Sequence, residues 1–273
     1  MNVPYYVEVR HRIEEVEDSR MQMLLKALYL FGAKISEMTG EKYQKDKQAP
    51  REILGPKGTY LDLYEFRLPN HKPIENAESL TIDNYRVVKG VRGDESFDEV
   101  EDAIKFAVFR LKFEEGRTQK NEEKERYVAL PISSKHEPWT KGLCKYFIDK
   151  GNNYVFPFHR QKAQDYIRRK RVFERLTYPI EYTMYGNAVD YQKRLGMDGL
   201  RLVRIMELFT KYGFDLWDMD AYGIKRLRDK GVHGQVLDVG KKYSDPWERY
   251  IMKLFKRNIA YKCKKCGHIE FSE

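Results

Sequence analysis

Two arginines occupy an otherwise apolar stretch in the C-terminal half of the sequence. Residues 199–209 read GLRLVRIMELF, and their apolar positions recur at the spacing of a buried helix face. A guanidinium is costly to bury without an anionic partner. We therefore expect Arg201 to meet either a carboxylate or a phosphate. The formal net charge of +9 makes phosphate a serious candidate.

A second group of cations is concentrated between residues 160 and 175, with apolar side chains at intervals that would hold a helix to a core. A helix of this kind is typical of elements that contact nucleic-acid phosphates. The alternative is a charged face that is merely solvated. The residues expected to contact DNA are Arg160, Lys162, Arg168, Arg169, Arg171 and Arg204.

The third chemical pattern lies near the C-terminus, where Cys263, Cys266 and His268 have the spacing of half a zinc site. The lysines around the two thiols favour their thiolate forms. Zinc needs four ligands, so His233, a second chain or further sequence would have to complete the site. No cofactor is otherwise expected.

The elements that must position these residues form an α+β arrangement, mainly helical with a small antiparallel sheet. Periodicity and turn residues predict a helix at 14–38, strands at 59–67 and 85–91, a helical turn at 97–105, a hairpin at 107–113 and 127–130, and then only helices, at 139–150, 160–176, 196–212, 216–230 and 247–257. We expect one domain over residues 1–258 and a separate tail over 259–273.

The composition limits the classes of protein to which this chain can belong. A sequence pI near 9.2 fits an anionic partner. Three cysteines do not form a disulfide framework, and no apolar run is long enough to span a membrane. The first residues lack the apolar core of a signal peptide. We expect an intracellular, cytoplasmic, DNA-associated protein with no membrane partner.

Two segments resemble the arginine boxes of the tyrosine recombinases, or phage-type integrases. Residues 28–38, LYLFGAKISEM, are similar to the first box, a leucine-rich helix ending Gly-x-Arg-Ile-Ser-Glu. Residues 198–208 resemble the second, His-x-Leu-Arg-His-x-Arg-Ile-Thr-Glu-Leu. The segment FPFHRQKA at 156–163 resembles one found in archaeal members. The resemblance covers most of the chain and implies the recombinase catalytic fold, with an active-site lysine on a hairpin between the boxes.

The family cleaves DNA with a tyrosine while two arginines, a lysine and two His or Trp side chains stabilise the phosphate transition state. By this resemblance, Lys34 replaces the first arginine and Arg201 keeps the second. The hairpin lysine is Lys120 or Lys124, with Lys112 as the other option. Asp198, Leu202 and Ile224 replace the His or Trp residues, and Glu37 is retained.

The resemblance places the nucleophile at Tyr250, with Tyr243 as the alternative, and Tyr250 could equally be a packing residue. Because so many transition-state contacts are lost, we expect a duplex-DNA-binding protein of the integration and recombination type that is catalytically impaired. It could act as a homo-oligomer on DNA. Two alternatives stay open, an active recombinase forming a 3′-phosphotyrosine, and a non-enzymatic basic protein that binds RNA or another protein.

Overall fold

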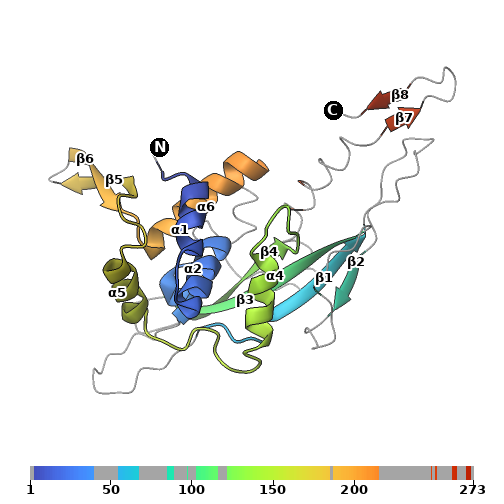
Figure 1. The fold of residues 1–273 in the computed structure, drawn as a ribbon, viewed down its shortest axis with the longest axis horizontal. Helices are drawn as coiled ribbons and strands as arrows, with labels where there is room; N and C mark the ends of the chain where they lie inside the picture. The colour runs from blue at the N-terminus through green and yellow to red at the C-terminus, as the bar shows by residue number, and fades with distance from the viewer. Residues whose placement is uncertain are drawn as a thin grey trace.

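A computed structural model describes residues 3–39, 55–67, 85–88, 97, 103–115, 122–184, 187–214, 247, 250, 260–262 and 269–271 (Figure 1). The helices in these ranges are α1 (Tyr6–Glu14), α2 (Ser19–Phe31), α3 (Ile35–Thr39), α4 (Thr140–Ile148), α5 (Arg160–Lys170) and α6 (Met197–Tyr212). The strands are β1 (Leu61–Arg67), β2 (Tyr85–Val88), β3 (Ala103–Glu115), β4 (Glu122–Pro131), β5 (Thr177–Met184), β6 (Asn187–Arg194), β7 (Ala260–Lys262) and β8 (Ile269–Phe271). The α+β class is therefore confirmed.

The single helix predicted at 14–38 is wrong as one element, because two shorter helices, α2 and α3, replace it and α1 precedes them. Asp18 caps α2 by accepting the backbone N–H groups of Arg20 and Met21, each at 3.0 Å. Gly32 ends α2 in the left-handed region, with φ of 54°. Glycine adopts this conformation without a Cβ clash, so the chain turns here and starts α3 in a new direction.

The main sheet is antiparallel with the strand order β2-β1-β3-β4. Its register places Phe109 opposite Leu61 on one side and Val128 on the other. The two predicted strands and the predicted hairpin are confirmed, with β3 and β4 both longer than expected. The helical turn predicted at 97–105 is wrong at its end, since β3 already begins at Ala103.

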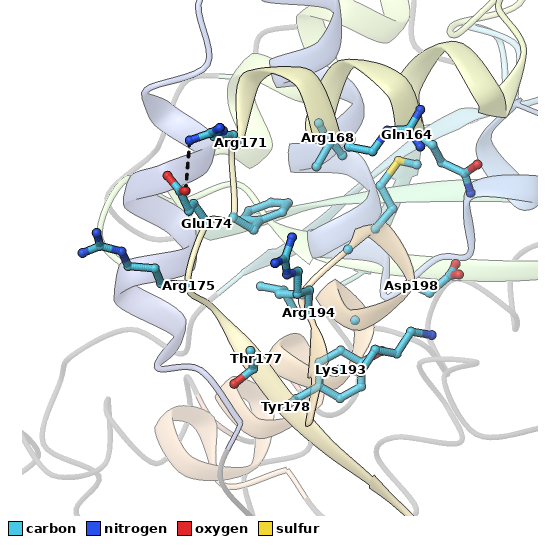
Figure 2. A pocket seen from close by; sticks show the side chains of 16 residues that line it. Gln164, Arg168, Arg171, Glu174, Arg175, Thr177, Tyr178, Lys193, Arg194 and Asp198 are labelled. Atoms are coloured by element: carbon cyan, nitrogen blue, oxygen red, sulfur yellow. Dashed lines mark hydrogen bonds and ion pairs between the residues drawn. The ribbon is translucent and has the colours of Figure 1, made fainter. Parts of the chain in front are cut away.

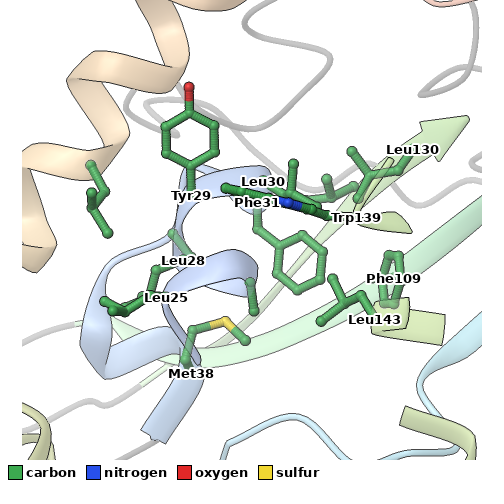
Figure 3. Close-up of a cluster of buried hydrophobic side chains, with 14 of the residues drawn as sticks. Leu25, Leu28, Tyr29, Leu30, Phe31, Met38, Phe109, Leu130, Trp139 and Leu143 are labelled. Atoms are coloured by element: carbon green, nitrogen blue, oxygen red, sulfur yellow. The ribbon is translucent and has the colours of Figure 1, made fainter. Parts of the chain in front are cut away.

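The core forms where α2 and α4 meet the sheet. The rings of Phe31, Phe109 and Phe147 lie 4.7–6.2 Å apart. Figure 3 shows Phe31 and Phe109 within this buried cluster. Trp139 packs edge-on against Tyr29, at 5.8 Å between the ring centroids. Aromatic pairs in such geometries stabilise a core beyond their buried area.

Cys144 lies on the buried face of α4 and is fully enclosed by this core. Burial raises the pKa of its thiol well above the ordinary value of 9.0. A thiol in such surroundings stays protonated and unreactive, so Cys144 packs as an apolar residue.

The second half of the chain departs most from its all-helical prediction. The helices predicted at 139–150 and 196–212 are confirmed as α4 and α6, whereas α5 ends six residues earlier than expected, at Lys170 rather than 176. The antiparallel hairpin of β5 and β6 follows it. The helix predicted at 216–230 lies outside the described residues, as do all but Trp247 and Tyr250 of 247–257.

The helices gather at one side of the molecule. α6 packs against α2 and α1, and α5 lies against α3. In Figure 1, α5 and the β5–β6 hairpin stand on the side away from the main sheet. Within the described ranges, no helix has both the length and the apolar character needed to cross a bilayer.

Candidate functional site

Helix α5 presents its charge to solvent. Ala163 is its fully buried residue, and Tyr166 and Ile167 are half-buried against the core. The cations predicted to contact DNA on this segment are all exposed: Arg160, Lys162, Arg168, Arg169 and Arg171. A helix attached along so narrow an apolar stripe leaves most of its circumference open to an external ligand.

Acidic neighbours compensate part of this charge. Arg168 pairs with Asp165 at 2.7 Å, Arg171 with Glu174 at 3.4 Å, and Lys170 reaches Glu17 at 3.6 Å. These cations are all more than half exposed, at 58–78% of the side chain. Exposed pairs contribute only about 0–1 kcal/mol each, so a phosphate can displace the carboxylates at low cost.

The chain leaves α5 through an unusual turn. Arg171, which caps the helix, has φ of 52°, and Arg175 has φ of 66°. Non-glycine residues seldom adopt the left-handed region, so two of them within five positions are notable. The turn is held by Phe173 and Leu176, which are buried. It brings the end of α5 beside the start of β5.

A cavity of about 680 Å³ lies between this turn, the ends of the β5–β6 hairpin and the beginning of α6 (Figure 2). Its basic lining residues are Arg168, Arg171, Arg175, Lys193 and Arg194, and its acidic ones are Glu174 and Asp198. Figure 2 shows Arg194 between the turn and α6, whereas Arg175 points away from the cavity. The cavity is thus a mainly apolar hollow with a cationic rim.

The N-terminus of α6 opens into the same cavity. Gly196 is the N-cap residue and, having no side chain, adds no capping hydrogen bond. A Cβ added there would meet no atom within 4 Å, so the space in front of the helix is open. The first amide groups of a helix point outward and carry its positive dipole end, which favours an anion. Asp198 is the acidic residue in this first turn.

Arg204 corrects one of the predicted DNA contacts. Its side chain is completely buried, 2.6 Å from Glu207 and 2.9 Å from Glu137. Arg10 joins the same carboxylates from α1, at 3.0 Å from Glu207 and 2.8 Å from Glu137. A buried guanidinium–carboxylate pair of the kind expected in this helix is thus found at Arg204. Arg204 is a structural residue, because its guanidinium is enclosed by protein.

Tyr29 completes this buried cluster by donating its hydroxyl to Glu207 at 2.8 Å. Burial by itself opposes ionisation of Glu207, but Arg204 and Arg10 outweigh it and hold the pKa of Glu207 below its ordinary value. Burial, and then the charge of Glu207, raises the pKa of Tyr29 well above 10.0. The cluster therefore combines an ionised Glu207 carboxylate with a neutral Tyr29 phenol near pH 7, and it joins α1, α2 and α6.

The two arginine-box segments are brought near each other through their helices, since α2 packs against α6. Lys34 itself is exposed, and Arg201 is half-buried. Glu37, retained from the first box, accepts the backbone N–H of Lys34 and so caps α3. Asp198, which stands where the family has histidine, lines the basic cavity.

Tyr250 lies in an aromatic cluster. Its ring is 5.1 Å from that of Tyr212, 6.4 Å from that of Trp247 and 5.6 Å from that of His136, all edge to face. It is half-buried against the core. These contacts show that the Tyr250 ring packs against its neighbours, and the nucleophile role stays a prediction.

Several predicted site residues fall outside the described part of the chain: Lys120, Ile224, His233, Tyr243, Cys263, Cys266 and His268. Lys112 and Lys124 are on the hairpin strands, where Lys112 pairs with Glu125 and Lys124 with Phe113 in the backbone register. The tail segment with the two cysteines is flanked by β7 and β8, which pair with Lys262 opposite Ile269.

Sequence reasoning missed the β5–β6 hairpin and, with it, Lys193 and Arg194. The alternation of Tyr178, Ile180 and Tyr182 followed by a Tyr-Gly-Asn turn is a strand signal that could have revealed it. The Arg204–Glu207 pair could also have been predicted from the sequence, because residues three positions apart share a helix face.

The sequence matches no protein-family model, and neither the curated proteins nor the solved structures contain a significant match to it. The likeness to tyrosine recombinases consequently rests on the arginine-box residues and the order of the elements.

Proposed function

We propose that the chain binds duplex DNA through the exposed face of α5 and the basic cavity beside it. The observation that carries the proposal is the continuity of these two features, since Arg168 and Arg171 belong to both. Clustered exposed cations bind the phosphate backbone by releasing its counterions, without reading the sequence. Such a surface suits a protein that is positioned on DNA by its phosphates.

The finer proposal is a tyrosine-recombinase-type catalytic fold with a degenerate site, acting in DNA integration or recombination. It is supported by the packing of α2 on α6, which carry the two boxes, and by the antiparallel sheet between them in the chain. Catalytic impairment is supported by Asp198, which lines the cavity. At this sequence position the family has a side chain that donates a hydrogen bond to the phosphate.

The proposal is tested by measuring duplex affinity by fluorescence anisotropy between 50 and 200 mM salt. We expect log Kd to change linearly with log salt, with a slope of about 0.9 for each phosphate contacted. The double variant Arg168→Ala with Arg169→Ala should weaken binding to every duplex alike and lower the slope by about 2. An affinity that hardly responds to salt would contradict the proposal.

The matched control is Lys141→Ala with Lys145→Ala, which removes two exposed cations from α4 instead. It should leave affinity and slope close to those of the unmodified chain. If both double variants weaken binding equally, net charge rather than the α5 surface is responsible. Double-stranded RNA of the same length is the competitor that tests the RNA alternative, and preferential RNA binding would replace the DNA proposal.

A further inference from the structure

The basic cavity has features that a surface for duplex backbone does not need. It is a half-open hollow rather than a stripe, and Phe173, Tyr178 and Met197 give it an apolar wall. Its volume of about 680 Å³ lies within the roughly 300–1,000 Å³ typical of small-molecule sites. An inorganic anion would leave most of that space empty.

The charged groups lie on several sides of the hollow, with Arg194 toward its middle. Arg194 stands between the turn after α5 and the start of α6, with Arg168 at the end of α5 and Lys193 beside the α6 N-terminus (Figure 2). Guanidinium groups and helix N-terminal amides are both complementary to a phosphate with several free oxygens. The cavity therefore offers a phosphate subsite adjoining an apolar chamber.

We propose that the cavity binds a nucleoside phosphate, with the phosphate on Arg194 and the α6 N-terminus and the nucleoside in the apolar chamber. This proposal rests on the proposed DNA-binding function and deepens it by naming the ligand of the cavity. A stacked base inside a duplex cannot enter the hollow. The ligand is a nucleotide unit that is unpaired. It comes either from the end of a nucleic-acid strand or from the free nucleotide.

Asp198 sets the strength of the site. It lines the cavity and lies in the first turn of α6, where it interacts favourably with the helix dipole. A bound phosphate competes with Asp198 for the same positive potential. Removing the charge of Asp198 must therefore strengthen phosphate binding while slightly weakening the helix, two effects of opposite sign from a single substitution.

The test is isothermal titration calorimetry with thymidine 5′-monophosphate, thymidine and inorganic phosphate. We expect the monophosphate to bind at least tenfold more tightly than either fragment. Arg194→Gln should weaken it about tenfold or more, the effect of losing one charge-assisted hydrogen bond. Arg12→Gln, which removes one cation from α1, is the control and should leave affinity unchanged. Equal binding of inorganic phosphate and the monophosphate would overturn the nucleoside part.

Two further variants separate binding from folding. Gly196→Asp places a carboxylate in the open space before α6, where aspartate is a favourable N-cap, so binding should be lost without a lower Tm. Asp198→Asn should bind about threefold to tenfold more tightly, although its Tm is slightly lower. Weaker binding by Asp198→Asn, or unchanged binding by Gly196→Asp, would overturn the proposal.

The source of the nucleotide is distinguished by a 5′-phosphorylated tetranucleotide and its unphosphorylated counterpart. Tighter binding of the phosphorylated tetranucleotide than of the monophosphate assigns a strand end, and the reverse assigns the free nucleotide. Duplex affinity is measured on the same variants. If duplex binds but no mononucleotide does, the cavity proposal is wrong and the proposed DNA binding stands. If the monophosphate binds and duplex does not, the DNA proposal fails instead.

Discussion

Arg10 and Glu207 are 197 positions apart in the chain, and their side chains are joined by two hydrogen bonds of 3.0 and 3.1 Å. The guanidinium also lies over the Trp139 ring, 4.5 Å from its centroid. This contact fixes α1 on α6. Because Glu207 is fully buried, its carboxylate has lost its hydration, and the paired cations compensate for that loss.

Arg10→Met should lower the free energy of unfolding by about 3–5 kcal/mol, because it leaves buried carboxylates with one cation fewer. Urea denaturation followed by circular dichroism measures the loss. Arg12→Met, on the same helix but 40% exposed and paired weakly with Glu15, is the matched control and should change stability by less than about 0.5 kcal/mol. Similar losses in both variants would show that helix propensity, not the buried pair, is responsible.

Stability should fall in acid through Glu207. Its pKa in the folded chain is below the ordinary 4.5, so its contribution is fully present above about pH 4.5 and is lost as pH falls toward the folded value. Glu207→Gln should be less stable at pH 7 and show a smaller further loss between pH 5 and 3. The check is urea denaturation at a series of pH values. A parallel pH dependence in the variant and the unmodified chain would exclude Glu207 as the source.

The periodicity of residues 199–209 correctly predicted α6 but could not identify its buried arginine. Arg201 and Arg204 are three positions apart, and both fall near the apolar face of a helix. The choice between them depends on Glu137 and Arg10, which only the tertiary fold brings to Arg204. The break at Gly32 was missed for a related reason, since the apolar pattern continues on both sides of the glycine and conceals the change of direction.

The exposed face of α5 was more readily predicted, because a dense run of cations has few ways to be buried. The cavity was not predicted, since it is assembled from the β5–β6 hairpin, in a stretch of the chain where no strand was expected. Lys193 and Arg194 lie at the end of β6, and only the pairing of β5 with β6 returns them to the turn after α5.

No strand cleavage should be detectable. Tyr250 is packed edge-on against three other aromatic rings, and Asp198 and Leu202 replace groups that support the phosphate in the resembled family. Incubation with nicked suicide duplexes, followed by denaturing gels, should show no covalent adduct while DNA binding persists. An adduct that disappears in Tyr250→Phe would prove the chain an active recombinase, and one that disappears in Tyr243→Phe would move the nucleophile.

Tyr250→Phe should leave the Tm nearly unchanged, because the ring that contacts Tyr212 and His136 is retained. Tyr250→Ala removes the ring and should lower stability by about 1–3 kcal/mol, less than the full cost of a completely buried aromatic residue. Thermal unfolding of the two variants side by side measures the difference. An equally large loss in both would assign the stabilisation to the hydroxyl instead.

The tail should bind zinc through Cys263, Cys266 and His268, the prediction drawn from their spacing. Elemental analysis of the purified chain is expected to find zinc, and Cys263→Ser with Cys266→Ser should remove it. Half an equivalent per chain would indicate two copies sharing one ion. Zinc that survives the double substitution, or none before it, would contradict the prediction.

Because Cys144 is sealed within the core with a raised thiol pKa, it can react only when α4 leaves its place. In a chain carrying serine at 263 and 266, a maleimide added under native conditions would therefore be consumed at the frequency of core opening. Cys144 would then be a single-site probe of transient opening. Its labelling rate with and without a ligand in the cavity would show whether that ligand slows the local opening of α4.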